Sequence, residues 1–241
     1  MDEDKLRSML LEDAALRPVE ANIYSVLPND ETGNAYDSRF GFIYDMVACN
    51  SIYNRLIWGY SVDIFRRMAN DALRSSSEGN VLDLACGSLA FTAKAYSRYG
   101  DRPVILMDQS LKMLRIAKSR LTAQGGSLAG NLVFLHSDAS CLPFKENAFT
   151  TILSENLLHC LDDTTPLLNQ LKTILAGNGK IFFTTLVKNG RWADIYLQAL
   201  AAGGKLISRS EDDHKEIFRG VGLAAKYETI GNLLSIECEP Q

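Results

Sequence analysis

From Asn80 to the C-terminus, short apolar runs alternate with longer amphipathic stretches. Short runs that are apolar on both faces are typical of buried parallel strands, and amphipathic stretches are typical of helices that cross over a sheet. The alternation therefore predicts an α/β fold with a Rossmann-like, doubly wound sheet of seven strands. We expect these strands at Val81–Ala85, Val104–Met107, Leu132–His136, Thr151–Ser154, Lys180–Leu186, Leu223–Thr229 and Leu233–Glu237.

Short polar signals mark the ends of several elements. The last two expected strands flank Gly231-Asn232, which predicts an antiparallel C-terminal hairpin that closes the sheet. Ser110 is a candidate N-cap for a helix over Leu111–Thr122. The run Ser210–Asp213 resembles a capping box for a helix that ends at Gly220.

Residues 1–79 follow a different pattern. They contain no convincing strand, several aromatic residues, and two expected helices separated by Pro28, Asp30 and Gly33. We expect residues 1–79 to form an N-terminal helical cap that acts as a substrate lid, and residues 80–241 to form one ligand-binding domain. The polar segment Ser75–Gly79 connects the two.

Composition narrows the classes of partner. A net charge of −4 and a pI near 5.5 give no long-range attraction for nucleic acid. No apolar run approaches the roughly 20 residues of a membrane span, and no basic leader precedes an apolar run, so we expect a cytoplasmic protein. The five cysteines form no C-x-x-C pair, which indicates reduced thiols and no metal site. A homodimer remains open.

The strongest local signal is the strand that ends in the small residues Ala85-Cys86-Gly87-Ser88. Small residues let a ligand approach the backbone, and ligands of open parallel sheets bind beyond the carboxyl ends of the strands. Asp108 lies 21 residues after Gly87, directly after the next expected strand. An acid there can accept hydrogen bonds from both ribose hydroxyls, or it can cap the helix that starts at Leu111.

The next two strands also end in polar residues. Asp138-Ala139 follows the third strand, where an adenine amino group would lie, and Phe144 is a candidate wall of that pocket. Ser154, Glu155 and His159 follow the fourth strand at the same edge of the sheet. These groups are expected to face one cleft.

Together these motifs resemble the class I S-adenosylmethionine-dependent methyltransferases, closest in style to the quinone-biosynthesis C-methyltransferases and their small-molecule relatives. The resemblance covers about Ala35 to Glu239. It rests on Asp83–Gly87, Asp108, Asp138-Ala139, the turn Leu175–Lys180, and the N-terminal pattern Tyr36-Asp37, Tyr44-Asp45 and Trp58.

The resemblance implies an enzyme that binds S-adenosylmethionine, releases S-adenosylhomocysteine and methylates a small hydrophobic or aromatic molecule. One departure is Leu89, where the family usually has a second glycine; we expect a reshaped pocket that still binds the cofactor. The cofactor-binding residues implied are Asp83, Ala85, Gly87, Ser88, Asp108, Gln109, Met113, Asp138, Ala139 and Ser154.

Methyl transfer mainly requires alignment of the acceptor and exclusion of water. A general base is needed only if the acceptor loses a proton, and His159, Tyr36 and Glu155 are the candidates. His159 can equally be a buried residue that orients its helix. We expect the aromatic side chains of the N-terminal segment (residues 1–79) to belong either to the core or to an acceptor pocket. The same two roles are open to Trp192 and Tyr196. The side chains concerned in the N-terminal segment are Tyr24, Phe40, Phe42, Tyr44, Tyr53, Trp58 and Tyr60.

Two other readings compete. The change at Leu89 permits a cofactor-binding protein with a cyclase or regulatory role that transfers no methyl group. A nicotinamide dehydrogenase also uses glycines followed by an acid, but the first turn lacks G-x-G-x-x-G.

Overall fold

The computed structural model describes residues 1–29, 50–97, 102–125 and 128–240. Within these residues nine strands form one mixed sheet in the order β1-β2-β5-β4-β3-β6-β7-β9-β8. The strands are β1 (Arg17–Glu20), β2 (Ile23–Ser25), β3 (Val81–Leu84), β4 (Val104–Asp108), β5 (Leu132–His136), β6 (Phe149–Glu155), β7 (Leu175–Leu186), β8 (Leu223–Ile230) and β9 (Leu233–Pro240).

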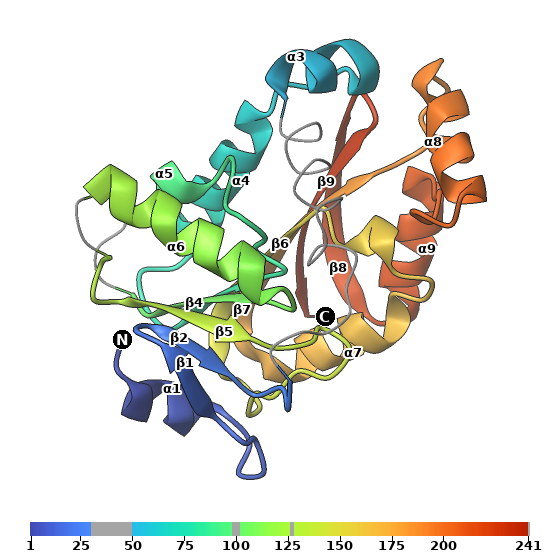
Figure 1. The fold of residues 1–241 in the computed structure, drawn as a ribbon. Coiled ribbons are helices and arrows are strands. Elements are labelled where there is room, and N and C mark those ends of the chain that lie inside the picture. Colours follow the sequence, from blue (N-terminus) through green and yellow to red (C-terminus); the bar gives the residue numbers. More distant parts are fainter. Residues whose placement is uncertain (30–49, 98–101, 126–127, 241) are drawn as a thin grey trace.

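Helices cover both faces of this sheet (Figure 1). They are α1 (Glu3–Met9), α3 (Ser51–Tyr53), the π-helical turn η2 (Asn54–Trp58), α4 (Asp63–Arg74), α5 (Ala93–Tyr96), α6 (Leu111–Gly125), the 3-10 turn η3 (Leu158–Cys160), α7 (Thr165–Ile174), α8 (Ala193–Ala202) and α9 (Glu211–Gly220).

The seven expected strands are confirmed as β3 to β9. Strand β3 lies between β4 and β6 and is parallel to both, so the chain winds outward from β3 in two directions. Strand β9 inserts between β7 and β8 and is antiparallel to both, which confirms the C-terminal hairpin. The carboxyl ends of β3, β4 and β6 thus meet at the point where the winding reverses, where such sheets bind ligands.

The expectation of no strand in residues 1–79 is wrong, because β1 and β2 extend the edge of the sheet. Strand β2 pairs in parallel with β5, and Ile23 lies opposite Phe134 and is fully buried. With four and three residues, β1 and β2 are too short to show a period in the sequence, and it is pairing with β5 that holds them. These two strands bring the sheet to nine, two more than expected, among the described residues.

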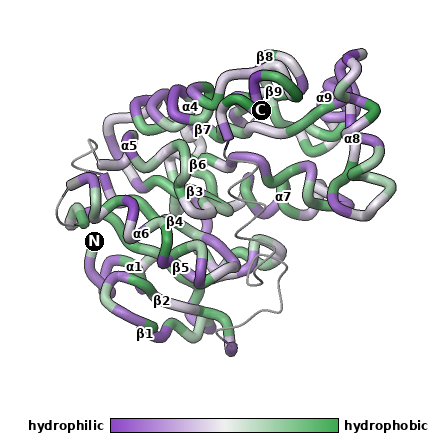
Figure 2. The backbone as a smooth tube through the Cα atoms, turned by 45° about the horizontal axis from the view of Figure 1, so that its top comes forward, coloured by the Kyte–Doolittle hydropathy of each residue, from purple (hydrophilic) through white to green (hydrophobic). Residues whose placement is uncertain are grey.

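Alternate residues of the central strands supply two separate cores. Leu82 and Leu84 pack on the side of α1, α7 and α9, whereas Val81 and Leu106 pack on the side of α4, α5 and α6. The hydrophobic colour of Figure 2 runs through the central strands, while α4 alternates hydrophilic and hydrophobic residues. Because side chains alternate along a strand, Asp83 points to the same side as Val81, toward α5.

The expected helix starts are confirmed at two places. The backbone N–H of Asp213 donates to the Ser210 hydroxyl (3.2 Å), and the Ser210 N–H donates to the Asp213 carboxylate (2.6 Å), which is a complete capping box. The Met113 N–H donates to the Ser110 hydroxyl (3.3 Å). These caps fix the start of α9 and the start of α6. The N-terminal end of α6 lies beside the carboxyl end of β4.

The turn of the C-terminal hairpin anchors the segment before α4. The Asn232 N–H donates to the carbonyl oxygen of Trp58 (2.8 Å). Gly231 has a φ of +63°, and a Cβ there would collide with the Trp58 carbonyl. Glycine therefore lets the hairpin approach η2 closely and holds Trp58 in place.

Candidate functional site

A cavity of about 410 Å³ opens at the carboxyl ends of β3, β4, β5 and β6. One side, which we call the strand-end wall, consists of residues at and beyond the carboxyl ends of these strands. The other side, the aromatic wall, consists of rings from the segments before α5 and from α8. The strand-end wall includes Asp83 to Leu89, Asp108, Gln109, Met113, Ser137 to Ala139, Glu155 and His159, and the aromatic wall includes Tyr53, Trp58, Tyr60, Phe65, Phe91 and Tyr196.

The turn after β3 has an unusual backbone. Ala85, Gly87 and Leu89 all have positive φ, of 58°, 55° and 53°. A Cβ added at Gly87 would meet no atom within 4 Å, so this turn leaves open space beside the backbone. A non-glycine residue in this conformation costs about 1 kcal/mol, and such strain is typical of ligand-binding turns.

Leu89 lines the cavity but belongs mainly to the core. Its side chain is 2% exposed and packs in the hydrophobic cluster between the sheet and α4, α5 and α6. The leucine thus directs most of its surface away from the open space at Gly87. This placement gives a physical reason why the departure from glycine need not fill the cavity.

Neighbouring groups hold the glycine turn. Asp108 accepts a hydrogen bond from the Gly87 N–H (2.8 Å) with one oxygen and from the Ser110 N–H (2.8 Å) with the other. The Arg120 guanidinium donates to the carbonyl oxygen (2.7 Å) and hydroxyl (2.5 Å) of Ser88. Asp108 therefore braces both the turn and the start of α6. Sequence reasoning missed Arg120, which gives no signal of its own in a helix rich in basic residues.

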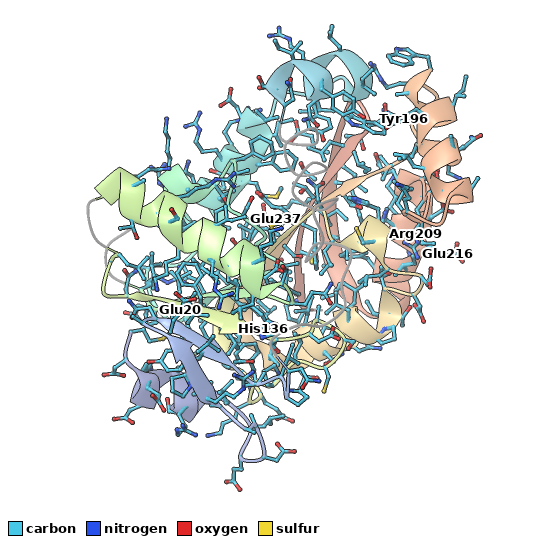
Figure 3. All side chains as sticks on the ribbon, viewed as in Figure 1. Glu20, His136, Tyr196, Arg209, Glu216 and Glu237 are labelled. Carbon is cyan, nitrogen blue, oxygen red and sulfur yellow. The ribbon has the colours of Figure 1, made fainter. Side chains whose placement is uncertain are left out.

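The strand-end wall continues across β5. His136 is buried between the Ser25 hydroxyl (3.0 Å from Nδ1) and the Gln109 carbonyl oxygen (3.1 Å from Nε2), and so links β2 to the cavity (Figure 3). Asp138 accepts a hydrogen bond from the Ser140 N–H (2.8 Å) and lines the cavity with Ala139. Sequence reasoning placed His136 in a strand but missed its link to Gln109.

Burial shifts the acid–base behaviour of this wall. Burial raises the pKa of Asp83 to about 7, against the opposing effect of the Tyr96 hydroxyl, which donates to the carboxylate at 2.6 Å; Asp108 raises the pKa further. Burial and the nearby Asp83 raise the pKa of Glu155 well above its usual value. Glu155 Oε1 is buried and has no hydrogen-bond partner among the described residues. This orphaned oxygen fits a cavity built for a ligand with a cationic group.

His159 lies in η3 and its protonation state follows from its contacts. The Leu186 N–H, which can only donate, lies 3.2 Å from Nδ1, and Thr185 Oγ1 lies at 3.2 Å. Nδ1 is therefore an acceptor, and the neutral ring carries its proton on Nε2. Burial, His214 and Arg209 lower the pKa of His159 to about 4. Near neutral pH the ring is uncharged, and Nε2 is a hydrogen-bond donor.

Arg209 fixes the turn that carries His159. Its guanidinium donates to the carbonyl oxygens of Leu158 (3.1 Å), Leu161 (2.9 Å) and Asp162 (2.6 Å). The Ile207 N–H also donates to the His159 carbonyl oxygen (2.7 Å). Sequence reasoning did not find this clamp, because its partners are backbone atoms more than 40 residues away.

Most of the expected site residues meet at this cavity. Asp83, Asp108 and Asp138 share it, together with Ala85, Gly87, Ser88, Gln109, Met113, Ala139 and His159. Ser154 is an exception: it is fully buried and does not line the cavity, because residues 154 and 155 point to opposite faces of β6. Tyr36 lies outside the described residues, as do Phe40, Phe42 and Tyr44.

The described aromatic residues divide between the two expected roles. Trp58 and Tyr60 are each 4% exposed, yet both line the cavity, and Tyr53 lines it too. Tyr196 lies on α8 (Figure 3). Its ring centroid is 5.5 Å from that of Trp58. Trp192 is 58% exposed and lies outside the lining of the cavity. Tyr24 packs against the core on the side of the sheet that α1, α7 and α9 cover.

Among the described residues, no helix combines the length and the hydropathy needed to cross a bilayer.

Known methyltransferases resemble this chain in sequence. The methyltransferase domain family matches residues 81–179, which run from the start of β3 into β7. The ubiquinone/menaquinone biosynthesis C-methyltransferase UbiE of Vibrio cholerae is 24% identical over 232 residues, covering 87% of this chain and 88% of that protein. The UbiE protein of a Marinomonas species is 25% identical over 218 residues, covering 88% and 85%.

Solved structures share the fold. Geranyl diphosphate C-methyltransferase from Streptomyces coelicolor, in complex with Mg²⁺, geranyl diphosphate and S-adenosyl-L-homocysteine, has a TM-score of 0.58 at 13% identity, covering 73% of this chain and 75% of that one. A SAM-dependent methyltransferase from Thermotoga maritima has a TM-score of 0.58 at 14% identity, covering 83% and 99%.

Proposed function

We propose that this chain is a class I S-adenosylmethionine-dependent methyltransferase of the small-molecule type, and that its acceptor is a hydrophobic or aromatic molecule. The observation that carries the proposal is the aromatic wall, which faces the strand-end wall across one cavity. Aromatic rings bind apolar and aromatic ligands by area and by ring contacts. The second reading, a cofactor-binding protein without methyl transfer, is not favoured.

We assign the cofactor to the strand-end wall. Asp108, which lines the cavity, would accept hydrogen bonds from the ribose hydroxyls. Gln109, Met113, Asp138 and Ala139 would surround the adenine, and the open backbone at Gly87 would adjoin the methionine part. When bound, the cofactor supplies an electrophilic methyl group on a sulfonium, so that transfer leaves a neutral thioether.

The chain's own task is then alignment and exclusion of water. Trp58, Tyr60 and Phe65 are nearly fully buried and would keep water from the side of the cavity opposite the strands. The His159 Nε2–H would donate a hydrogen bond to an oxygen of the acceptor and so orient it. A role for His159 as a general base finds no support in the geometry, because Nδ1 already accepts a backbone N–H. Tyr36 remains a candidate base.

We further propose that the segment before α4 serves as the lid of the acceptor pocket. Its described part places Tyr53, Asn54 and Trp58 on the cavity, and the C-terminal hairpin holds it through Trp58. The lid would be narrower than residues 1–79, because β1 and β2 belong to the sheet.

We also propose that the protein acts in the cytoplasm without nucleic acid. The four cysteines among the described residues are free thiols, which fits a reducing compartment. The net charge of −4 offers no attraction for polyanions.

The test combines binding with turnover. Calorimetry should detect binding of both S-adenosylmethionine and S-adenosylhomocysteine. A panel of acceptors should then be screened for S-adenosylhomocysteine production, beginning with hydroquinones, since UbiE relatives are named for C-methylation in quinone biosynthesis. Polar acceptors such as free amino acids serve as the matched negative set. Cofactor binding without turnover on any apolar acceptor would contradict the proposed acceptor class, and absence of binding would contradict the assignment of the cavity.

A further inference from the structure

The cavity wall carries acidic groups on three neighbouring strands. In the sheet register Asp83 lies opposite Leu106 of β4 and Leu153 of β6. Asp108 and Glu155 come two residues after these partners, so both point to the same face as Asp83. All three line the cavity. Their shared placement thus concentrates negative charge on one side of it.

No basic group compensates Asp83 and Glu155 within the described part of the chain. Asp83 is held by the Tyr96 hydroxyl, and one Glu155 oxygen has no partner there. The groups that act on the pKa of the two carboxyls are Tyr96, Asp108 and Asp83 itself. Burial, Asp83 and Asp108 also raise the pKa of the Cys86 thiol. The wall is therefore anionic without a resident cation.

The nearby basic side chains are engaged elsewhere. Arg120 of α6 binds Ser88, and His159 interacts with His214 and Arg209. None of the charged groups of α4, which packs against β6, acts on the pKa of either carboxyl. Those groups are Asp63, Arg66, Arg67, Asp71 and Arg74.

Two buried carboxylates cannot both ionise at low cost without a cation. Burial raises the pKa of Asp83 to about 7 and that of Glu155 well above its usual range. Without a cationic ligand, burial and the like charges on one wall therefore favour a state in which the pair retains a proton. A ligand that brings positive charge to this wall stabilises the ionised carboxylates and so favours release of that proton.

We propose that Asp83 and Glu155 form a charge-selective pair that holds one proton in the absence of a cationic ligand and releases it when the sulfonium form of the cofactor binds. The inference rests on the proposed function and deepens it. Both S-adenosylmethionine and its product carry an ammonium group, which balances one carboxylate. Only S-adenosylmethionine carries a second cation, which balances the other. After transfer, the sulfur would retain the two electrons of the broken carbon–sulfur bond and become neutral. The two carboxyls Asp83 and Glu155 would then regain a proton from solvent.

Calorimetry at pH 8 in phosphate and in Tris tests this, since the two buffers differ in ionisation enthalpy and the difference in heat counts released protons. S-adenosylmethionine should release about one proton more than S-adenosylhomocysteine. Sinefungin, which has an amine cation in place of the sulfonium, should resemble S-adenosylmethionine. Across the pH range in which the pair titrates, preference for S-adenosylmethionine over the product should rise up to about tenfold per pH unit.

The decisive variant is Glu155→Gln, which keeps the shape of the side chain and removes its charge. It should abolish the difference in released protons between the two cofactor forms and make the preference independent of pH. Glu216→Gln, the same change at an exposed position on α9, should leave the difference intact (Figure 3). Urea denaturation should verify that each variant folds.

Equal proton counts for both cofactor forms in the wild-type protein would overturn the inference, whatever the variants do. A full difference that persists in Glu155→Gln would overturn it as well. In both cases calorimetry would still detect binding of the cofactor, so the proposed function would not be contradicted. If neither ligand bound to the wild-type protein, the proposed function itself would fail.

Discussion

The two walls of the cavity are built by different kinds of interaction. The strand-end wall consists of short runs of residues at and beyond the ends of parallel strands, and hydrogen bonds such as that from Gly87 N–H to Asp108 (2.8 Å) fix its shape. The aromatic wall joins segments far apart in the chain, as in the contact of Trp58 with Tyr196 (5.5 Å). Hydrogen bonds set the first wall, and side-chain packing sets the second.

This difference has a functional consequence. Directional hydrogen bonds impose one geometry and suit a ligand whose chemistry never changes, such as a cofactor. Packing surfaces tolerate exchange of one apolar side chain for another and suit an acceptor that varies between relatives. Changes in the strand-end wall should therefore act on cofactor binding, and changes in the aromatic wall on the acceptor.

The largest effect is expected from Asp108→Ala. The change removes the partner of two backbone N–H groups and the proposed ribose acceptor, and hydrogen bonds to a charged group contribute about 1.5–3 kcal/mol each. We expect the Kd for S-adenosylhomocysteine to rise by about 10²- to 10³-fold, measured by calorimetry. Asp71→Ala, at an exposed position of α4, is the matched control. An unchanged Kd in Asp108→Ala would remove Asp108 from the cofactor site.

Arg209→Ala tests the turn that carries His159 in the strand-end wall. Three carbonyl oxygens lose a charged donor, and Leu158, next to one of the oxygens, is fully buried. We expect the free energy of unfolding to fall by about 3 kcal/mol, measured by urea denaturation. Arg209→Lys keeps the charge without the fork of donors and should recover only part of the loss. Equal midpoints for the wild type and Arg209→Ala would mean that the clamp is not stabilising.

Tyr196→Ala should separate the walls directly. The ring lines the cavity and is 41% exposed, so its loss should raise the KM for an apolar acceptor by about tenfold and leave the cofactor Kd unchanged. Trp192→Ala, at the N-cap of the same helix and outside the lining, should change neither. Steady-state kinetics with the first active acceptor measures both. A parallel rise in the cofactor Kd would contradict the division into two walls.

The sequence predicts the strand-end wall far better than the aromatic wall. Residues after buried strands are local signals, so Gly87, Asp108 and Asp138 could be placed at one edge from the order of strands alone. Ser154 is expected at the cavity, but its neighbour Glu155 faces the cavity instead. Successive side chains of a strand point to opposite faces, so an error of one residue changes the face. The sequence does not decide whether Trp58 belongs to the hydrophobic core or to the acceptor pocket. In the structure it is buried in the core and also lines the cavity.

The edge of the sheet shows the same limit. Strand β2 has three residues and forms by pairing with β5, more than 100 residues later, so no local period announces it. The C-terminal hairpin, in contrast, has a turn sequence and two long strands next to each other in the chain, and it was predicted correctly. Long-range partners such as Arg209 and the carbonyls of residues 158–162 lie beyond any local signal.

The smallest effect is expected from His159→Gln, which tests how the two walls cooperate. The ring is neutral down to a pKa of about 4 and offers an Nε2–H, which a glutamine amide can replace. We expect kcat to fall by less than about threefold in His159→Gln and by about tenfold in His159→Ala, which leaves no donor. Because the pKa lies near 4, replacing His159 should not alter the shape of the kcat/KM profile between pH 6 and 8. If glutamine were as damaging as alanine and removed an ionisation in that range, His159 would be a general base, and the acceptor would be activated from the strand-end wall instead of being merely oriented by it.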